Sequence, residues 1–547
     1  MEQSNRLTTS VLRLCHLIFL TGLSPWLCSS LVYSQADAPS GSRPNILFAF
    51  ADDWGKYASA YADTSPPSTV VATPHFDRVA REGALFHQAF VTAPSCTPCR
   101  SSLLSGQYFW RTGQGAILQG AVWNERIPSF PLLLADGGYH IGHSYKVWSP
   151  GRPSNAPYGA KKFAYNRRGN RFSRFSQTVS SANDTEAAKK TLFDEVRGNF
   201  RDFIAERPSD APFCYWFGPT NCHRKWTRGS GKALWGIDPN GLRGKMPPFL
   251  PDVAEVREDF ADYLGEVQAF DSALGVLLDE LEALGELDNT LIIVSGDHGI
   301  PGFPRAKCNL YDFGVAVPLA IRWGAVAAGG REIRDFVNLM DLAPTLLEAA
   351  GEPVPDVMTG RSLVNVLNSE MSGQVDPERT FVVTGRERHV AAARPGHLPY
   401  PQRAIRTKDF LYIRNFHPER WPMGVAPGFG LPEGPWPTQE RLTQNTFSAF
   451  GDFDASPTKA FLGRVRHQAE MKPYVDFAFG RRPAEELYDL RLDPHQMNNV
   501  ASQTNYQSTR EQLSDQLWNV LTETGDPRVT DASARYERPP FAGPLAN

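Results

Sequence analysis

Residues 46–53 read Ile-Leu-Phe-Ala-Phe-Ala-Asp-Asp, a short apolar run that ends in two adjacent carboxylates. A continuous apolar run of this length, without polar alternation, is typical of a β-strand that is buried on both faces of a sheet. Open α/β sheets bind their ligands at the carboxyl ends of the strands. We therefore expect Asp52 and Asp53 to lie at a binding site.

Further predicted strands alternate with predicted helices along the chain. Apolar residues at helical spacing predict helices over residues 73–83 and 260–284, and continuous apolar runs predict strands over residues 212–217 and 290–295. This alternation favours a mostly parallel sheet that is sandwiched between helices on both faces. The predicted fold class is therefore α/β.

Beyond a polar linker the pattern changes. Residues 381–383 and 410–413 predict short strands, and residues 513–521 predict a closing helix. Pro, Gly and Arg are frequent between these elements. We expect a catalytic α/β domain over residues 43–375 and a smaller α+β domain over residues 376–547.

The N-terminus has the pattern of a secretory signal. Arg6 and Arg13 precede an apolar stretch over residues 14–27, and a polar, loose segment follows. The apolar stretch is short and interrupted by a glycine and a proline, which argues against a membrane-spanning helix. We expect residues 1–34 to be a cleaved signal, and the protein to be exported to a periplasm, an extracellular space or a lysosome-like lumen.

Composition restricts the partners. The chain has 547 residues and a formal net charge of −3, so it offers no overall electrostatic basis for binding nucleic acid. Any recognition of an anion must therefore be local.

The chain has seven cysteines, of which Cys15 and Cys28 lie in the expected signal. The remaining five are an odd number. At least one thiol must then have a fate other than a disulfide.

The most specific local pattern is Cys-Thr-Pro-Cys-Arg at residues 96–100, which leads into Ser-Ser-Leu-Leu-Ser-Gly. We expect a helix to begin here, with Arg100 one turn along it, and the N-terminus of a helix favours anions. A pattern of five residues also fits a structural cysteine beside a helix cap, so its meaning depends on the rest of the chain.

A second polar pair supports a site. Asp297 and His298 follow the strand predicted over residues 290–295, just as Asp52 and Asp53 follow the first strand. Hard oxygen ligands suit Ca²⁺ or Mg²⁺. Each pair alone fits a helix cap or a turn. Two pairs at equivalent strand ends, with the cysteine motif between them in sequence, predict a metal site.

These segments together resemble the type I sulfatases. In that family a Cys-x-Pro-x-Arg core directs a formylglycine-generating enzyme to oxidise its cysteine to Cα-formylglycine, whose hydrated aldehyde attacks sulfur. Only Cys96 has Pro and Arg at the required offsets, and Cys99 stands where the family usually has Ser or Ala. The resemblance extends through most of the chain, with further similar segments at residues 72–78, 138–140, 299–301, 341–347 and 486–490.

The resemblance implies an alkaline-phosphatase-like fold and the hydrolysis of a sulfate ester or sulfamate. It implies a Ca²⁺ site, with Mg²⁺ as the alternative, held by Asp52, Asp53, Cys96, Asp297 and His298. The catalytic residues that it implies are Cys96, Arg100, Lys146, His223 and Lys307. Among these, His223 and Lys307 contact the sulfate, and His223 protonates the leaving group.

One position departs from the family pattern. The segment Lys146-Val147-Trp148 stands where the family usually has Lys-x-His, so the histidine that assists sulfate elimination is absent. A sulfated-glycan binding protein with an altered site is therefore one alternative. A phosphodiesterase or phosphonate monoester hydrolase of the same superfamily is another.

The substrate class is suggested by a narrower likeness. Residues 297–311 resemble the corresponding segment of the heparan N-sulfatases, which cleave N-sulfoglucosamine. We expect a sulfated carbohydrate substrate, with sugar contacts from Glu387 and His389 in the second domain. An O-sulfatase that acts on another sulfated polysaccharide is the alternative. The sequence does not determine the oligomeric state.

Overall fold

The computed structural model describes residues 43–324, 326–531 and 535–542. The signal predicted over residues 1–34 lies outside these ranges. The chain from Gly41 onward forms one compact unit. None of the helices within the described ranges combines the length and the apolar character that crossing a bilayer requires.

The central element is a sheet of seven strands in the order β4-β5-β1-β6-β7-β2-β8. Neighbouring strands from β4 to β6 run parallel, β7 is antiparallel to both of its neighbours, and β2 pairs with β8 in parallel. The predicted, mostly parallel α/β sheet is therefore confirmed. Its strands are β1 Asn45–Ala51, β2 Ala84–Phe86, β4 His140–Tyr145, β5 Phe213–Gly218, β6 Thr290–Gly296, β7 Leu319–Trp323 and β8 Arg331–Ile333.

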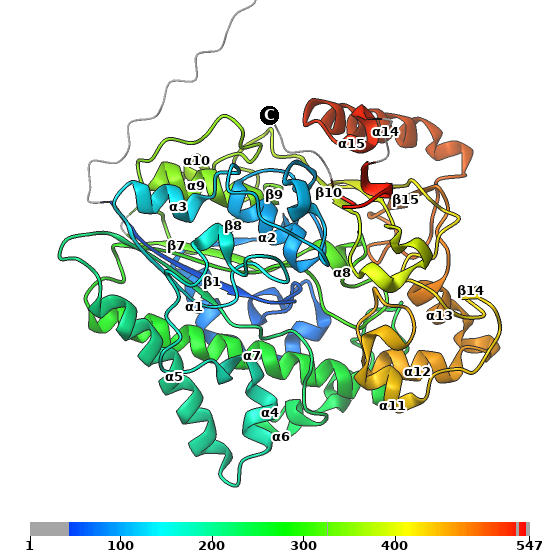
Figure 1. Cartoon of the computed structure of the whole chain (residues 1–547), viewed down its shortest axis with the longest axis horizontal. Coiled ribbons are helices and arrows are strands. Elements are labelled where there is room, and N and C mark those ends of the chain that lie inside the picture. The colour runs from blue at the N-terminus through cyan, green and yellow to red at the C-terminus, as the bar shows by residue number, and fades with distance from the viewer. Residues whose placement is uncertain (1–42, 325, 532–534, 543–547) are drawn as a thin grey trace, which may run out of the picture. The chain divides into compact units, whose positions relative to one another are not determined.

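Helices cover both faces of this sheet, as Figure 1 shows for α5 and α7 on one face and for α2, α3 and α9 on the other. β1 supplies Leu47, Ala49 and Ala51 to one core and Ile46, Phe48 and Phe50 to the other, which explains its unbroken apolar sequence. The main helices are α1 Pro74–Glu82, α2 Cys96–Ser105, α3 Phe130–Asp136, α5 Thr185–Ala205, α7 Ala254–Ala283 and α9 Leu342–Ala349.

The C-terminal part contains a four-stranded antiparallel sheet in the order β10-β11-β12-β15. Helix α14, Gln507–Glu523, packs on this sheet through Leu513, Leu517 and Leu521. Other C-terminal residues, including Phe450 and Phe461, join the same core as α7. A boundary at residues 375 and 376 stays a prediction. The strands are β10 Phe381–Arg386, β11 Gln402–Thr407, β12 Phe410–Asn415 and β15 Glu485–Asp489.

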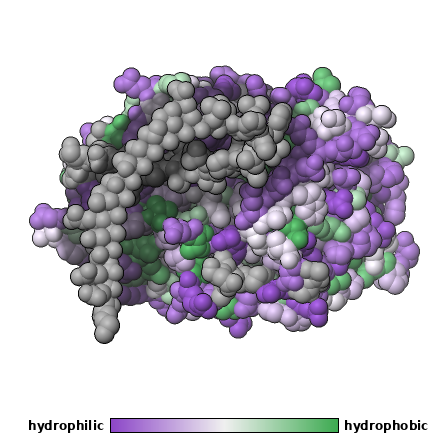
Figure 2. Space-filling view, turned by 90° about the horizontal axis from the view of Figure 1, so that it is seen from above, coloured by the Kyte–Doolittle hydropathy of each residue, from purple (hydrophilic) through white to green (hydrophobic). Residues whose placement is uncertain are grey.

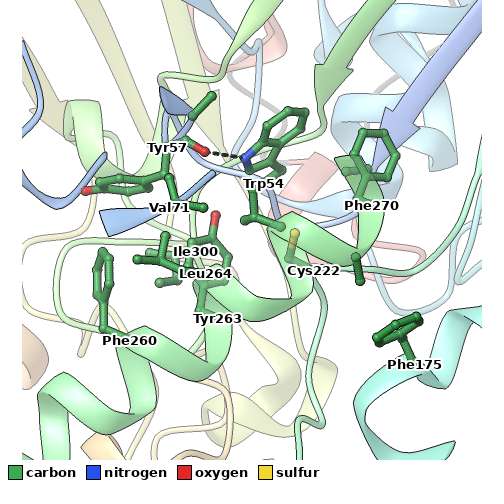
Figure 3. Packing of buried hydrophobic residues seen from close by; sticks show 14 of the residues in the cluster. Trp54, Tyr57, Val71, Phe175, Cys222, Phe260, Tyr263, Leu264, Phe270 and Ile300 are labelled. Atoms are coloured by element: carbon green, nitrogen blue, oxygen red, sulfur yellow. Dashed lines mark hydrogen bonds between the residues drawn. The ribbon is translucent and has the colours of Figure 1, made fainter. Parts of the chain in front are cut away.

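The loop after β1 is held in place by hydrogen bonds to a tyrosine of α7. Trp54 is fully buried, and its indole N–H donates to the carbonyl of Tyr57 at 2.9 Å (Figure 3). The hydroxyl of Tyr263, on α7, accepts the Gly55 N–H at 2.9 Å and lies 3.3 Å from the carbonyl oxygen of Asp53. Buried packing therefore sets the position of the two carboxylates that follow β1.

The face seen in Figure 2 is mostly hydrophilic, with scattered hydrophobic residues.

Candidate active site

Two adjacent parallel strands bring the pairs Asp52-Asp53 and Asp297-His298 together. β1 and β6 are in register, with Ala51 opposite Gly296, so the residues that follow them meet at one edge of the sheet. The Asp53 N–H donates to Asp297 Oδ1 at 2.7 Å. Gly296 is required here, because a Cβ at this position would lie 2.5 Å from the carbonyl oxygen of Trp54. The sequence prediction that these pairs share a site is consistent with this geometry.

Cys96 is the first residue of α2 and its side chain lies over the acidic groups. Its Sγ is 3.4 Å from His298 Nε2 and 4.0 Å from Asp53 Oδ1. The ligand atoms of Asp53, Cys96, Asp297 and His298 all lie within 4.8 Å of one another. Asp52 joins a second, overlapping group that contains Asp53 and His223. The five residues predicted to hold a metal are thus gathered in two overlapping groups.

Arg100 lies behind the acidic groups. Its guanidinium is fully buried and donates to Asp297 Oδ2 at 2.8 Å, to Asp52 Oδ1 at 3.0 Å and to the carbonyl of Val147 at 3.0 Å. It does not line the cleft described below. The sequence predicted a catalytic residue, whereas the geometry supports a positioning role in which Arg100 holds two carboxylates in place.

Two lysines balance the carboxylates from the cleft side. Lys146 Nζ lies 2.7 Å from both carboxylate oxygens of Asp52, and Lys307 Nζ lies 3.0 Å from both oxygens of Asp53. Burial disfavours a charged ammonium, yet Asp454 and Asp53 hold the pKa of Lys307 well above its usual value. Burial also opposes ionisation of Asp52, but Lys146 and Arg100 keep its pKa well below the ordinary value. Asp52 and Lys307 are therefore charged at neutral pH.

His223 approaches the site from the solvent side. Its Nε2 is 3.8 Å from Asp53 Oδ2, and 34% of its side chain is exposed. The loop that carries it is bonded to the end of β1, because the Cys222 N–H donates to the carbonyl of Asp52 at 2.6 Å. The carbonyl of Arg224 accepts a hydrogen bond from His223 Nδ1, which leaves Nε2 free to face the cleft.

A cleft with a volume of about 320 Å³ lies between Cys96 and residues of the C-terminal part of the chain. Cys96, Lys146, His223, Lys307 and His389 were predicted from the sequence to belong to the site, and all of them line this cavity. Its other polar and aromatic walls were not predicted from the sequence, because they lie in loops and short helices that follow no predicted strand or motif. These walls are Gln119, Gln444, Asn445, Thr446, Phe447 and Asp454.

His389 and Glu387 have different environments. His389 Nδ1 lies 2.8 Å from the hydroxyl of Ser95, and burial lowers the pKa of His389 to about 3, so its imidazole is neutral. Glu387 does not line the cleft. Its carboxylate is fully buried in ion pairs with Arg403 at 2.9 Å and Arg528 at 2.6 Å. The prediction that Glu387 contacts a sugar is therefore wrong, because both of its oxygens are engaged inside the protein.

This correction carries an expected result. Glu387→Ala should lower the free energy of unfolding by about 3–5 kcal/mol, because it removes a carboxylate shared by two buried arginines. The matched control is Glu378→Ala, which breaks an exposed ion pair with Arg361 and should cost about 0–1 kcal/mol. Denaturant unfolding measures both. A Glu387→Ala protein of unchanged stability but weakened substrate affinity would restore the original prediction.

Trp148, which stands where the family usually has a histidine, faces away from the cleft. It is fully buried, its indole N–H donates to Ser101 Oγ at 2.8 Å, and its ring packs edge-on against Trp123 at 5.8 Å. Trp148 therefore secures α2 and does not contact a ligand in the cleft. The imidazoles that line the cleft are those of His223 and His389.

The cysteines of the described ranges carry no disulfide. Cys96, Cys99, Cys214, Cys222 and Cys308 are free and buried. Burial raises the pKa of the Cys96 thiol well above its usual value, although Lys146 and Lys307 oppose this effect. As an unmodified thiol, Cys96 would therefore be a poor nucleophile at neutral pH.

Known proteins resemble this chain over most of its length. The sulfatase family profile matches residues 44–352, and the profile of the N-sulphoglucosamine sulphohydrolase C-terminal region matches residues 297–421. N-sulphoglucosamine sulphohydrolase of Homo sapiens is 28% identical over 533 residues, which cover 92% of this chain and 96% of that protein. An ulvan-active sulfatase of Formosa agariphila is 26% identical over 500 residues, covering 88% of this chain and 76% of that protein.

Solved structures share the fold. One is a protein in complex with its substrate D-glucosamine-2-N,6-O-disulfate, with a TM-score of 0.60, 18% identity and coverage of 90% of this chain and 100% of that one. A phosphonate monoester hydrolase of Silicibacter pomeroyi has a TM-score of 0.57 and 16% identity, with coverage of 88% and 96%. Both confirm the alkaline-phosphatase-like architecture. Since the sulfatase profile spans more than half of the chain, this protein belongs to the sulfatase family of hydrolytic enzymes.

Proposed function

We propose that this chain hydrolyses a sulfate ester or sulfamate of a sulfated glycan through a formylglycine derived from Cys96. The observation that carries the proposal is the position of Cys96, on the wall of the cleft, beside Asp53 and His298 and within a cavity lined by Lys146 and Lys307. The hydrated aldehyde of formylglycine supplies a hydroxyl nucleophile that the buried thiol does not.

The donor set fits a divalent cation. Asp52, Asp53 and Asp297 contribute carboxylates and His298 contributes Nε2 beside the Cys96 side chain. Carboxylate oxygens suit Ca²⁺ or Mg²⁺. When bound, such an ion supplies Lewis acidity that makes a hydroxyl more acidic and offsets negative charge on a substrate. We propose Ca²⁺, with Mg²⁺ as the alternative.

The cationic side chains would orient the sulfuryl group. Lys146 and Lys307 are buried side chains that line the cleft, and at such positions interactions with anionic oxygens are stronger than in bulk water. Arg100 does not reach the substrate but holds Asp52 and Asp297 in place through its two ion pairs. We propose Lys146 and Lys307 as sulfate contacts and Arg100 as a positioning residue.

His223 is the proposed acid for the leaving group. Its Nδ1 is engaged by a backbone carbonyl, so Nε2 is the nitrogen that can give a proton to a departing oxygen or nitrogen. Partial exposure allows the ring to take up another proton from solvent after each cycle. We propose that His389 contacts the sugar as a neutral donor or acceptor.

The N-sulfoglucosamine assignment rests on similarity. The matched C-terminal profile and the human relative both bear that name, and the fold neighbour described above binds a glucosamine that is sulfated on nitrogen and on O6. We propose N-sulfoglucosamine at the end of a glycan as the first substrate to test.

We also propose that residues 1–34 are removed as the protein is exported. We propose in addition that a formylglycine-generating enzyme converts Cys96.

A substrate panel tests the proposal. The purified, matured protein is expected to release sulfate from N-sulfoglucosamine and from an activated aryl sulfate. It is not expected to cleave bis(4-nitrophenyl) phosphate at a comparable rate. Cleavage of O-sulfated sugars alone would overturn the sulfamidase assignment and keep the sulfatase. Binding of sulfated glycans without any sulfate release would favour the binding-protein alternative.

His223→Ala should reduce sulfamate cleavage more than aryl sulfate cleavage, because an amine must be protonated before the S–N bond breaks. We expect the ratio of the two kcat/KM values to change by roughly 10²–10⁴-fold. The control is His467→Ala, which removes an exposed imidazole that does not line the cleft. Equal losses on both substrates would show that His223 only binds sulfate.

A further inference from the structure

A second cavity, of about 880 Å³, opens beside the catalytic cleft, and Lys146 lines both. We call it the basic groove and define it by Lys146, Arg171, Arg174, Arg224 and Lys225, the five cations that line it. Its other lining residues are neutral, namely Ser, Thr, Asn, Gln and Tyr, and none is acidic. The net charge of the chain is −3, so this positive groove is a local feature.

Three of the five charges lack a close counter-ion. Lys146 is neutralised by Asp52, and Arg224 forms two bonds with Asp259, at 2.8 and 2.9 Å. The side chain of Arg171 is 63% exposed, and its Nε lies 4.0 Å from Glu195 Oε2. Arg174 and Lys225 are also exposed, and neither forms an ion pair with any acidic group in the part of the chain that the structure describes. The positive charge of the groove is therefore available to a ligand.

The wall of the groove is fixed to the loop that carries His223. The Thr220 hydroxyl donates to the carbonyl of Ser173 at 3.1 Å, and the Thr220 N–H donates to the Ser173 hydroxyl at 3.2 Å. The side chain of Gln177 donates to the carbonyl of Lys225 at 2.9 Å. The segment that bears Arg171 and Arg174 is thus held against the loop that carries His223.

The groove and the cleft also meet at Lys225. Its Nζ donates to Gln444 Oε1 at 3.0 Å, and Gln444 lines the cleft. The two cavities are therefore adjacent, with Lys146 on the wall of both and a hydrogen bond from a groove residue to a cleft residue.

We propose that the basic groove is a binding subsite for a second anionic group, a sulfate or a carboxylate, on a sugar next to the one that is desulfated. This inference rests on the proposed function and names the substrate class more closely: a polyanionic oligosaccharide is preferred over a sulfated monosaccharide. Exposed guanidinium groups suit both anions, because each presents paired oxygens to a planar donor fork.

The test uses the double variant Arg171→Gln/Arg174→Gln in the full chain. The substrates are N-sulfoglucosamine and a heparan-derived tetrasaccharide that ends in N-sulfoglucosamine. We expect the ratio of kcat/KM for the tetrasaccharide to that for the monosaccharide to fall by about 10-fold in the variant. The matched control, Arg167→Gln/Arg168→Gln, removes the same charge from neighbouring exposed arginines that pair with Glu206 and Asp202 outside the groove. It should keep the wild-type ratio.

A binding measurement separates this inference from the proposed function. Affinity for the tetrasaccharide is measured in the Cys96→Ala background, where no turnover is needed, with the groove and control substitutions added. Loss of affinity in the groove variant alone supports the subsite even when no sulfate release is found. Tetrasaccharides lacking either the neighbouring O-sulfates or the uronate carboxylates identify which anion binds. Equal affinities and equal ratios in the groove and control variants overturn the subsite.

Discussion

Cys96→Ala should lower the rate of sulfate release by at least about 10³-fold, because it removes the precursor of the proposed nucleophile. The substitution deletes one buried sulfur atom at the start of α2, so the fold should persist. Sulfate release from an aryl sulfate measures the loss, and circular dichroism with denaturant unfolding measures the fold. Cys96→Ser should be equally inactive, because a serine hydroxyl lacks the second oxygen that expels sulfate from the enzyme.

Cys99→Ala is the control for the motif. Cys99 is also buried in α2, but it packs in the hydrophobic core and does not line the cleft. Activity close to wild type is expected, since the substitution gives a residue that the sulfatase motif commonly has. Full activity of Cys96→Ala would contradict the assignment of the nucleophile.

Removal of divalent cations should abolish activity, and Ca²⁺ or Mg²⁺ should restore it, because the carboxylates beside Cys96 form a hard-ligand site. Asp297→Asn should weaken Ca²⁺ affinity by at least about 10-fold, since it removes a charged ligand that lies within the predicted set. Calorimetric titration of Ca²⁺ into the metal-free protein gives the affinity without reference to turnover.

The control for this site is Asp476→Asn, which removes an exposed carboxylate that pairs with Lys472. Its Ca²⁺ affinity should equal that of wild type. Restoration by Mn²⁺ or Zn²⁺ alone would assign a softer ion, in keeping with the nitrogen of His298, and would correct the Ca²⁺ assignment. Full activity in protein shown to be metal-free by elemental analysis would contradict the metal site itself.

The sequence predicted the central sheet well because its signals are local. β1 and β6 are largely apolar strands that are buried on both faces, and each is followed directly by a pair of polar residues. The helix after Cys96 was predicted from a motif that lies in the same short segment. Where polar residues directly follow two buried strands of one parallel sheet, the sequence suffices to expect them at the same edge of that sheet.

The C-terminal contribution to the cleft could not be predicted in this way. Asp454 lies on a loop, and the segment 444–447 joins the end of helix α11, Gln439–Gln444, to a short 3₁₀ helix. Only the tertiary fold brings them opposite Cys96. Glu387 follows β10 and was taken for a substrate contact, but its partner Arg528 is far along the chain, and no local pattern indicates that pairing. Likewise, the predicted helix over residues 260–284 begins earlier, at Ala254, where Asp259 binds Arg224 of the catalytic loop.

The most direct test of the central claim is the mass of the tryptic peptide 82–100, which contains Cys96 and Cys99, in preparations made with graded amounts of a formylglycine-generating enzyme. Conversion replaces the CH₂–SH group of one cysteine by an aldehyde, so the peptide loses one sulfur and two hydrogens, gains one oxygen and keeps a single alkylatable thiol. Fragmentation assigns the aldehyde to Cys96 or Cys99. The account predicts that specific sulfatase activity rises in proportion to the fraction of peptide that carries the aldehyde at Cys96. Full activity in a preparation whose Cys96 is entirely thiol would contradict it.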